Sequence, residues 1–87
     1  MDQAYSLNPQ GYSSSFTINY PWYGLFSSAE VKIVNEMERV YQCRLNNNVV
    51  LWIRKLISSG KWIDVNEERE TTLTSVIGNY IDDYLRK

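Results

Sequence analysis

The apolar residues near the end of the chain follow the spacing of one helix face more cleanly than those of any other stretch. They recur three and four positions apart, and the charged residues of the same stretch lie off this stripe. Such a stripe faces either the core of its own domain or a coiled-coil seam. The sequence predicts a third helix that packs in the core, with a homodimer through this helix as the alternative. The stripe consists of Leu73, Val76, Ile77, Tyr80, Ile81, Tyr84 and Leu85.

The predicted start and middle of this helix carry further signals. Asp64 or Asn66 is expected to cap it, and three glutamates follow within residues 67–70, where acidic side chains suit the positive end of a helix. Gly78 lies in the middle, where glycine costs about 1 kcal/mol relative to alanine. Either a neighbouring element approaches the helix closely at Gly78, or the chain tolerates the cost.

Two further helices are predicted between residues 27 and 59. Ser27 and Glu30 have the spacing of a capping box, and apolar residues recur at helical spacing after them. An asparagine run ends this first helix. The strongly apolar stretch 49–59 is then predicted to form a second helix at the centre of the core.

Residues 1–26 differ in character from the rest of the chain. They contain one charged residue, Asp2, and seven of the twelve aromatic residues. Residues 16–20 alternate apolar and polar side chains, which is the period of a half-buried strand, and residues 21–24 have the composition of a turn. Residues 62–65 also permit a brief strand, which is expected to pair with residues 16–20.

Together these patterns predict a mainly α fold. A three-helix domain over residues 27–87 follows an extended, aromatic-rich N-terminal segment over residues 1–26. Both belong to one folding unit, because 87 residues are the usual size of one domain. The only β-structure expected is a short β-ribbon.

The reactive side chains of the chain are few. It has no histidine, one cysteine (Cys43) and four scattered glycines. The missing imidazole removes the commonest general base and metal ligand, and a single thiol cannot build a zinc site within one chain. The carboxylates are explained by helix starts and solvated helix surface. The sequence therefore predicts a non-enzymatic protein with no catalytic residue, no metal site and no cofactor.

The aromatic segment is the most unusual feature that could carry binding. Tryptophan and tyrosine are frequent anchors of protein interfaces. The predicted protein-binding residues are Tyr20, Trp22, Tyr23 and Phe26. The alternative is that these rings only cover the core. On the first interpretation the chain is a small protein–protein interaction module, and we suggest a regulator or inhibitor of a host protein encoded by a phage or other mobile element.

A second hypothesis is a small DNA-binding regulator in which the first two helices form a helix-turn-helix. Its phosphate contacts would be Arg39, Arg44, Arg54, Lys55 and Lys61. Two observations weigh against it. The net charge of −1 lacks the basic excess typical of such proteins, and the candidate recognition helix has few polar groups to read bases.

The surroundings of the protein are predicted from what the sequence lacks. One cysteine permits no internal disulfide, which fits a reducing compartment. No stretch approaches the roughly 20 apolar residues of a membrane-spanning helix. We therefore expect a cytoplasmic protein that does not contact a membrane.

Overall fold

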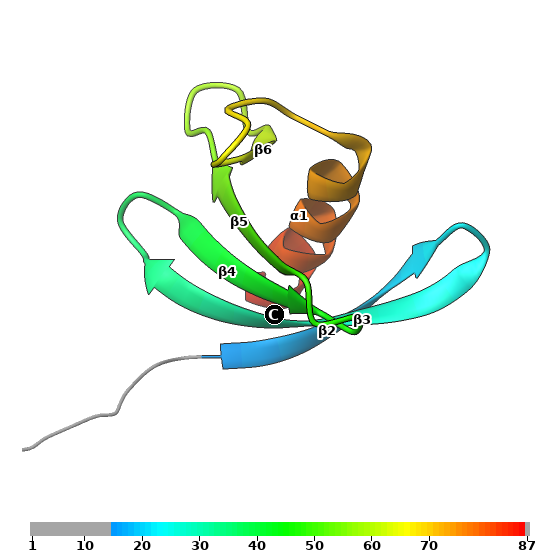
Figure 1. Cartoon of the computed structure of the whole chain (residues 1–87). Helices are drawn as coiled ribbons and strands as arrows, with labels where there is room; N and C mark the ends of the chain where they lie inside the picture. Colours follow the sequence, from blue (N-terminus) through cyan, green and yellow to red (C-terminus); the bar gives the residue numbers. More distant parts are fainter. Residues whose placement is uncertain (1–14, 87) are drawn as a thin grey trace, which may run out of the picture.

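The chain folds as a curved antiparallel β-sheet followed by one C-terminal helix (Figure 1). A computed structural model describes residues 15–86. Each strand pairs with the next along the chain, so the five strands lie in the order β2-β3-β4-β5-β6. The elements are β2 (Ser15–Trp22), β3 (Leu25–Asn35), β4 (Val40–Leu45), β5 (Val50–Lys55), β6 (Trp62–Asp64) and α1 (Thr72–Leu85).

The prediction of a mainly α, three-helix protein is wrong: the fold is α+β and mostly strand. The predicted first helix is β3 and β4, joined by a turn. In β3, Ala29 and Val31 are buried while Glu30 and Lys32 are exposed, which is the period of a strand. The helical spacing after Ser27 comes from two adjacent strands. When their apolar residues are counted along the sequence through the connecting turn, they recur at about the 3.6-residue period of a helix.

The predicted second helix is β5, and it is the partner of β4 in a hairpin. Its residues Val50 to Ile53 are β-branched, aromatic or leucine, types that favour a pleated, half-buried surface. Asn48 has a positive φ of 67° in the connecting turn, a conformation that asparagine tolerates well. Because residues 27–55 are strands and turns, the helix-turn-helix on which the DNA-binding hypothesis rested does not exist.

Three local predictions are confirmed for the type of element, but the pairing of one strand and the start of the helix differ from the prediction. Residues 16–20 lie in β2, and the third helix is α1. Residues 62–64 form β6, but this strand pairs with β5 and not with residues 16–20. The helix begins later than predicted, because Asp64 caps a turn by accepting hydrogen bonds from the backbone N–H groups of Asn66 (2.8 Å) and Glu67 (3.0 Å). The N-cap of α1 is Thr71.

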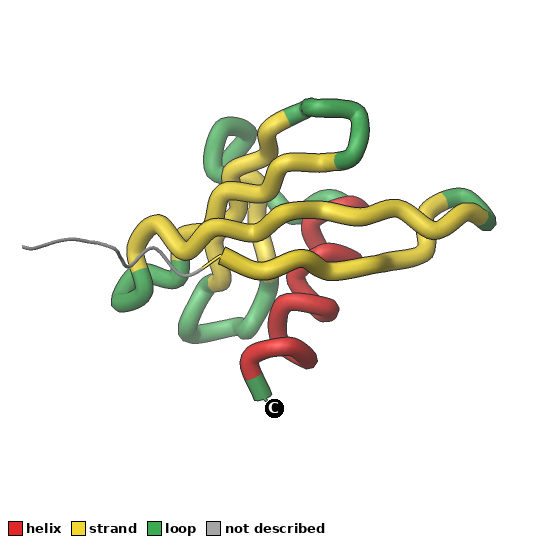
Figure 2. Tube along the Cα trace, turned by 90° about the horizontal axis from the view of Figure 1, so that it is seen from below, coloured by secondary structure: helices red, strands yellow, loops and turns green. Residues whose placement is uncertain are grey.

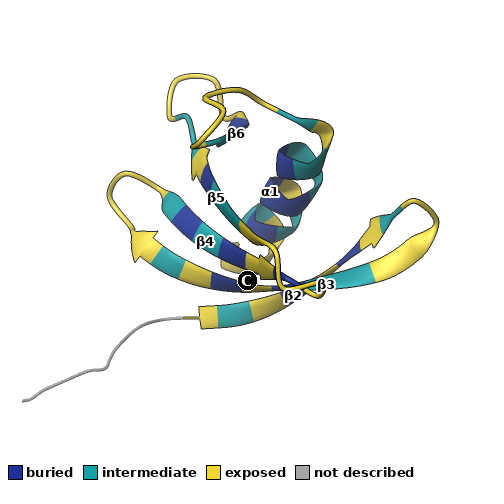
Figure 3. Cartoon of the chain, in the orientation of Figure 1, coloured by how far each residue is buried: buried dark blue, intermediate teal, exposed yellow. Residues whose placement is uncertain are grey.

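The core lies between the concave face of the sheet and α1 (Figure 3). The helix packs on β2, β5 and β6, and Figure 2 shows it behind the strands. Ile77 and Ile81 of the apolar stripe are fully buried by the sheet, while Tyr84 and Leu85 remain about half exposed. The stripe therefore serves mainly as core. A homodimer through α1 stays a prediction, with only these two large apolar residues of the stripe exposed.

Trp62 joins the sheet to the helix at the centre of this core. It is 2% exposed, and its indole N–H donates to Asp82 Oδ2 of α1 at 3.1 Å. Lys55 Nζ donates to the other oxygen of the same carboxylate at 2.8 Å. The buried hydroxyl of Thr74 donates to the backbone carbonyl of Trp62 at 2.9 Å. These bonds hold both ends of α1 against β5 and β6.

The face of the sheet opposite α1, which we call the open face, carries mostly polar side chains. Cross-strand partners point to the same side of a sheet, so the register of the strands defines its members. Among them are Thr17, Asn19, Glu30, Lys32, Gln42, Arg44, Trp52 and Arg54.

Candidate functional site

The most unusual surface of the described chain is the end of the β2–β3 hairpin, which extends away from the helix (Figure 1). Three large apolar side chains within four positions are almost fully in water: Tyr23 (88% exposed), Leu25 (73%) and Phe26 (83%). The half-buried Trp22 stands beside them, with its ring edge-on to Tyr23 at 4.9 Å. We call these four residues the hairpin tip.

The local sequence explains why the chain turns here. Trp22 and Leu25 are cross-strand partners, so only Tyr23 and Gly24 form the loop. Both have positive φ angles, 52° and 76°, which is the requirement of the tight type I′ hairpin turn. Glycine adopts this conformation freely, but a bulky residue such as tyrosine does so at a cost of roughly 1–2 kcal/mol. The exposed turn residues Arg39 and Glu68 also have positive φ angles, so the exposure of the Tyr23 ring, rather than its backbone angle, distinguishes the hairpin tip.

The structure separates the four predicted protein-binding residues. Tyr23 and Phe26 are exposed at the hairpin tip, whereas Tyr20 is a core residue only 2% exposed. Trp22 is half-buried and packs against the core. Leu25 is also exposed at the hairpin tip and was missed, because Tyr23-Gly24 is not one of the residue pairs that commonly mark a two-residue hairpin turn.

The five basic residues of the DNA-binding hypothesis do not form one surface. Arg44 and Arg54 share the open face, but Lys55 points to the opposite side and pairs with Asp82. Arg39 lies in the β3–β4 turn, and Lys61 lies in the loop before β6. The fold therefore scatters the positive charge over the sheet, the turn and the loop.

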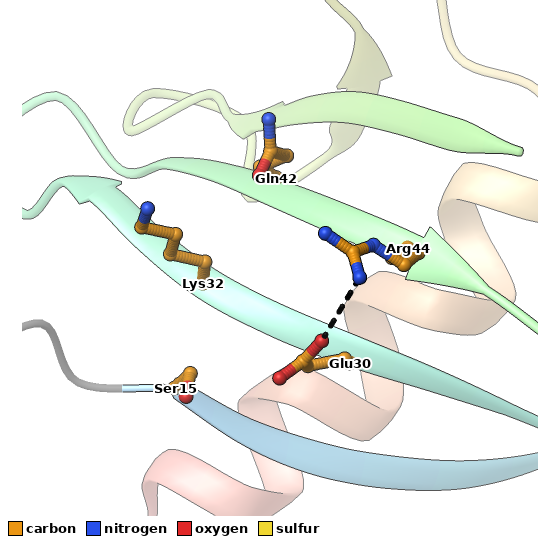
Figure 4. A pocket seen from close by; sticks show the side chains of 5 residues that line it. All are labelled: Ser15, Glu30, Lys32, Gln42 and Arg44. Carbon is orange, nitrogen blue, oxygen red and sulfur yellow. Dashed lines mark ion pairs between the residues drawn. The ribbon is translucent and has the colours of Figure 1, made fainter. Parts of the chain in front are cut away.

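A shallow polar hollow of about 230 Å³ lies on the open face (Figure 4). Arg44 Nη1 and Glu30 Oε1 are 4.0 Å apart across it, and both side chains are more than half exposed. Opposite charges so far in water attract weakly. The hollow offers hydrogen-bonding groups but no enclosed, desolvated pair that could transfer a proton. Its lining residues are Ser15, Glu30, Lys32, Gln42 and Arg44.

Several of the remaining carboxylates have structural partners. Asp82 holds Lys55 and Trp62, Asp83 pairs with Arg86, and Glu67 pairs with Arg69. Within residues 15–86 there is no group of three or more histidine, cysteine, aspartate or glutamate side chains that could hold a metal ion. In the same part of the chain, no helix has the length and apolar character to cross a membrane.

Cys43 is fully buried in β4, and burial raises the pKa of its thiol from 9.0 to about 12. The neutral thiol is a poor nucleophile. We expect the native protein to react with a thiol-specific disulfide reagent at pH 8 at least about 100-fold more slowly than the denatured protein, because reaction requires the sheet to open. The rate at which the absorbance of the released chromophore rises in both states measures this ratio, and equal rates would show that the thiol is accessible.

The same pKa difference gives a dependence of stability on pH. Since the folded state holds its proton up to about pH 12 and the unfolded state only to about pH 9, the contribution of Cys43 is fully present below pH 9 and is lost as the pH rises through this window.

Comparison of the chain with protein-family models, with curated proteins and with solved structures finds no match.

Proposed function

We propose that this chain is a non-enzymatic protein-binding module that contacts its partner through the hairpin tip. The observation that carries the proposal is the exposure of Tyr23, Leu25 and Phe26, each more than 70% in water. Scattered apolar residues on a surface need no explanation, but three exposed large apolar residues at the end of one protruding hairpin are typical of an interaction site. Phe26 lies on the same face as Pro21, and Leu25 lies on the opposite face with Trp22, so the hairpin tip offers apolar contacts on both of its sides.

The energetics support this use of the hairpin tip. Removing an exposed large apolar side chain from water gains roughly 1.5–3 kcal/mol. The fold gains nothing from these three side chains because they touch little of the protein. Tyr23 also carries the backbone cost of its positive φ, and its exposed ring offsets little of that cost within the folded chain.

The test compares two variants in the full chain. Replacing Tyr23 and Phe26 together by serine should leave the melting temperature nearly unchanged and should weaken partner binding at least 10-fold, because two interface anchors are lost. The matched control is Met37→Ser, since Met37 is also 88% exposed but lies in the β3–β4 turn. Partner binding is measured by pull-down from cells of the source organism with quantitative mass spectrometry.

The outcomes separate clearly. A protein that is captured by the original chain and by Met37→Ser, but lost with the double variant, supports the proposal. Capture should also persist at 1 M salt, because apolar contacts are not screened. A partner retained by the double variant, or a double variant that unfolds, contradicts the assignment of the hairpin tip as the contact surface.

We further suggest that the module acts in the cytoplasm as a regulator or inhibitor of a host protein. A chain that works by covering a partner's surface changes that partner's activity by occupancy alone. The solitary Cys43 suits a reducing compartment. Nucleic-acid binding has weaker support. Of the three cations on the open face, Lys32, Arg44 and Arg54, Arg44 faces the opposite charge of Glu30, and the chain as a whole carries a net charge of −1.

A further inference from the structure

Among residues 15–86, no strand pairs with the outer edge of β2. In the sheet order β2 is terminal, and among residues 15–86 it pairs only with β3. Natural edge strands are usually short, charged or interrupted, which prevents a second chain from pairing with them. β2 is eight residues long and has no charged side chain. Only Pro21, near its end, resists pairing.

The hairpin determines which backbone groups face outward. The closing pair of a two-residue hairpin, here Trp22 and Leu25, exchanges hydrogen bonds, and such pairs then alternate along the ladder. The even-numbered residues of β2 therefore bond to β3. The N–H and C=O groups of Thr17 and Asn19 point away from the sheet. Pro21 also holds an outward position, so its missing N–H costs the sheet nothing.

A groove of about 280 Å³ runs beside these outward groups. On one side is the edge of β2, and on the other is α1, which passes beyond that edge in Figure 2. Tyr84 stacks on Phe16, with ring centroids 4.0 Å apart, near one end. Asp83 is the only charged residue of the lining. The lining residues are Thr17, Ile18, Asn19, Tyr80, Asp83 and Tyr84.

We propose that this groove receives an extended segment of the partner protein, which adds to the sheet as a strand beside β2 and places a lysine or arginine opposite Asp83. The inference rests on the proposed function and names the form in which the partner binds. Thr17 and Asn19 together offer two N–H donors and two C=O acceptors, and alternate side chains of the added strand face Tyr80 and Tyr84.

The charge of the groove and its position next to the hairpin tip both favour a segment of the partner protein as the occupant. β2 itself contributes no charge, so Asp83 provides the only charge in the lining of the groove. The only ionic partner of Asp83 within residues 15–86 is the exposed Arg86, which a cation of the partner protein can replace. β2 leads directly into the hairpin tip at Trp22. Pro21 ends the backbone ladder there, and the apolar side chains of the hairpin tip continue the contact.

The geometry disfavours a second copy of this chain as the added strand. A copy of β2 would bring its own α1 over the same junction. Neighbouring strands lie only about 4.8 Å apart, whereas the axes of packed helices need about 8–10 Å. A partner segment without a helix above it meets no such obstacle.

The experiment selects peptides from a phage-displayed library of random decapeptides on the immobilised full chain. We expect enrichment of sequences that combine β-branched residues with a lysine or arginine. Asn19→Pro removes one outward N–H that the fold does not use and should lower peptide retention at least 10-fold. The matched control Asn19→Ser keeps the N–H and should retain the peptides. Asp83→Lys, on the exposed side of α1, should reject them, and circular dichroism checks each fold.

Several results would overturn the inference. These are no enrichment, peptides retained by both Asn19→Pro and Asp83→Lys, or a concentration-dependent dimer in sedimentation that Asn19→Pro abolishes. Slow exchange of the Thr17 and Asn19 amides before any peptide is added would show that the chain itself occupies the edge. The double variant of Tyr23 and Phe26 separates the two proposals: if it keeps both the selected peptides and the cellular partner, the groove stands and the role of the hairpin tip fails.

Discussion

Replacing Gly78 by alanine should lower the free energy of unfolding by about 3 kcal/mol, at the upper end of the usual cost of overpacking a core. Helix propensity alone predicts the opposite sign, a gain of about 1 kcal/mol. The packing effect wins because a Cβ atom at Gly78 would overlap the indole ring of Trp62. That ring is 2% exposed and is held by its bond to Asp82, so it cannot move aside cheaply.

Urea unfolding followed by circular dichroism measures this effect. The control is Asn79→Ala, one position further along α1 and exposed to solvent, which should change stability by no more than about 0.5 kcal/mol. A double variant, Gly78→Ala with Trp62→Leu, tests the cause. If the overlap with the indole is responsible, the second change should make the first less costly. Gly78→Ala that is neutral or stabilising would show that α1 does not approach β6 so closely.

Replacing Trp62 by alanine should cost about 3–5 kcal/mol, the usual range for deleting a large buried aromatic side chain. Much of the stability of a domain of this size would be lost. The ring fills the space between β6, Tyr41 and α1, and its removal also leaves Asp82 without one of its two donors. We expect the variant to melt well below the original protein and with less cooperativity, in calorimetry.

Two comparisons make the result specific. Trp52→Ala removes the same side chain from the half-buried open face and should cost clearly less. Trp62→Phe keeps most of the ring but loses the indole N–H, so it should cost about 1.5–3 kcal/mol for the lost hydrogen bond to a charged group. Equal costs for Trp62→Ala and Trp52→Ala would contradict the central place of Trp62 in the core.

The candidate site was only partly predictable. Tyr23 and Phe26 were singled out from composition, and both are exposed at the hairpin tip. Tyr20, singled out on the same grounds, is buried. Residues of one type in one segment cannot be divided into core and surface until the direction of each side chain is known, and that depends on the strand pairing. The groove beside β2 had no local signal, because its two walls are 60 positions apart in the sequence.

The elements that could be predicted from the residues alone are those whose periodicity is continuous and local. The helix α1 spans fourteen residues without a turn inside it, and the alternation of β2 is likewise uninterrupted. Between residues 27 and 59 the apolar residues match a helix as well as a pair of strands, because each strand is short and a turn joins them.

The choice between a helix and a pair of strands depends on contacts between distant parts of the chain. A helix satisfies its backbone within itself, whereas a strand needs a partner that the local sequence does not name. β3 gains β2 and β4 as partners, and α1 then covers the face that these strands share. The same non-local packing explains Gly78, which has a low helix propensity. Because it has no side chain, the backbone of α1 can approach β6 there, and the ring of Trp62 packs against it.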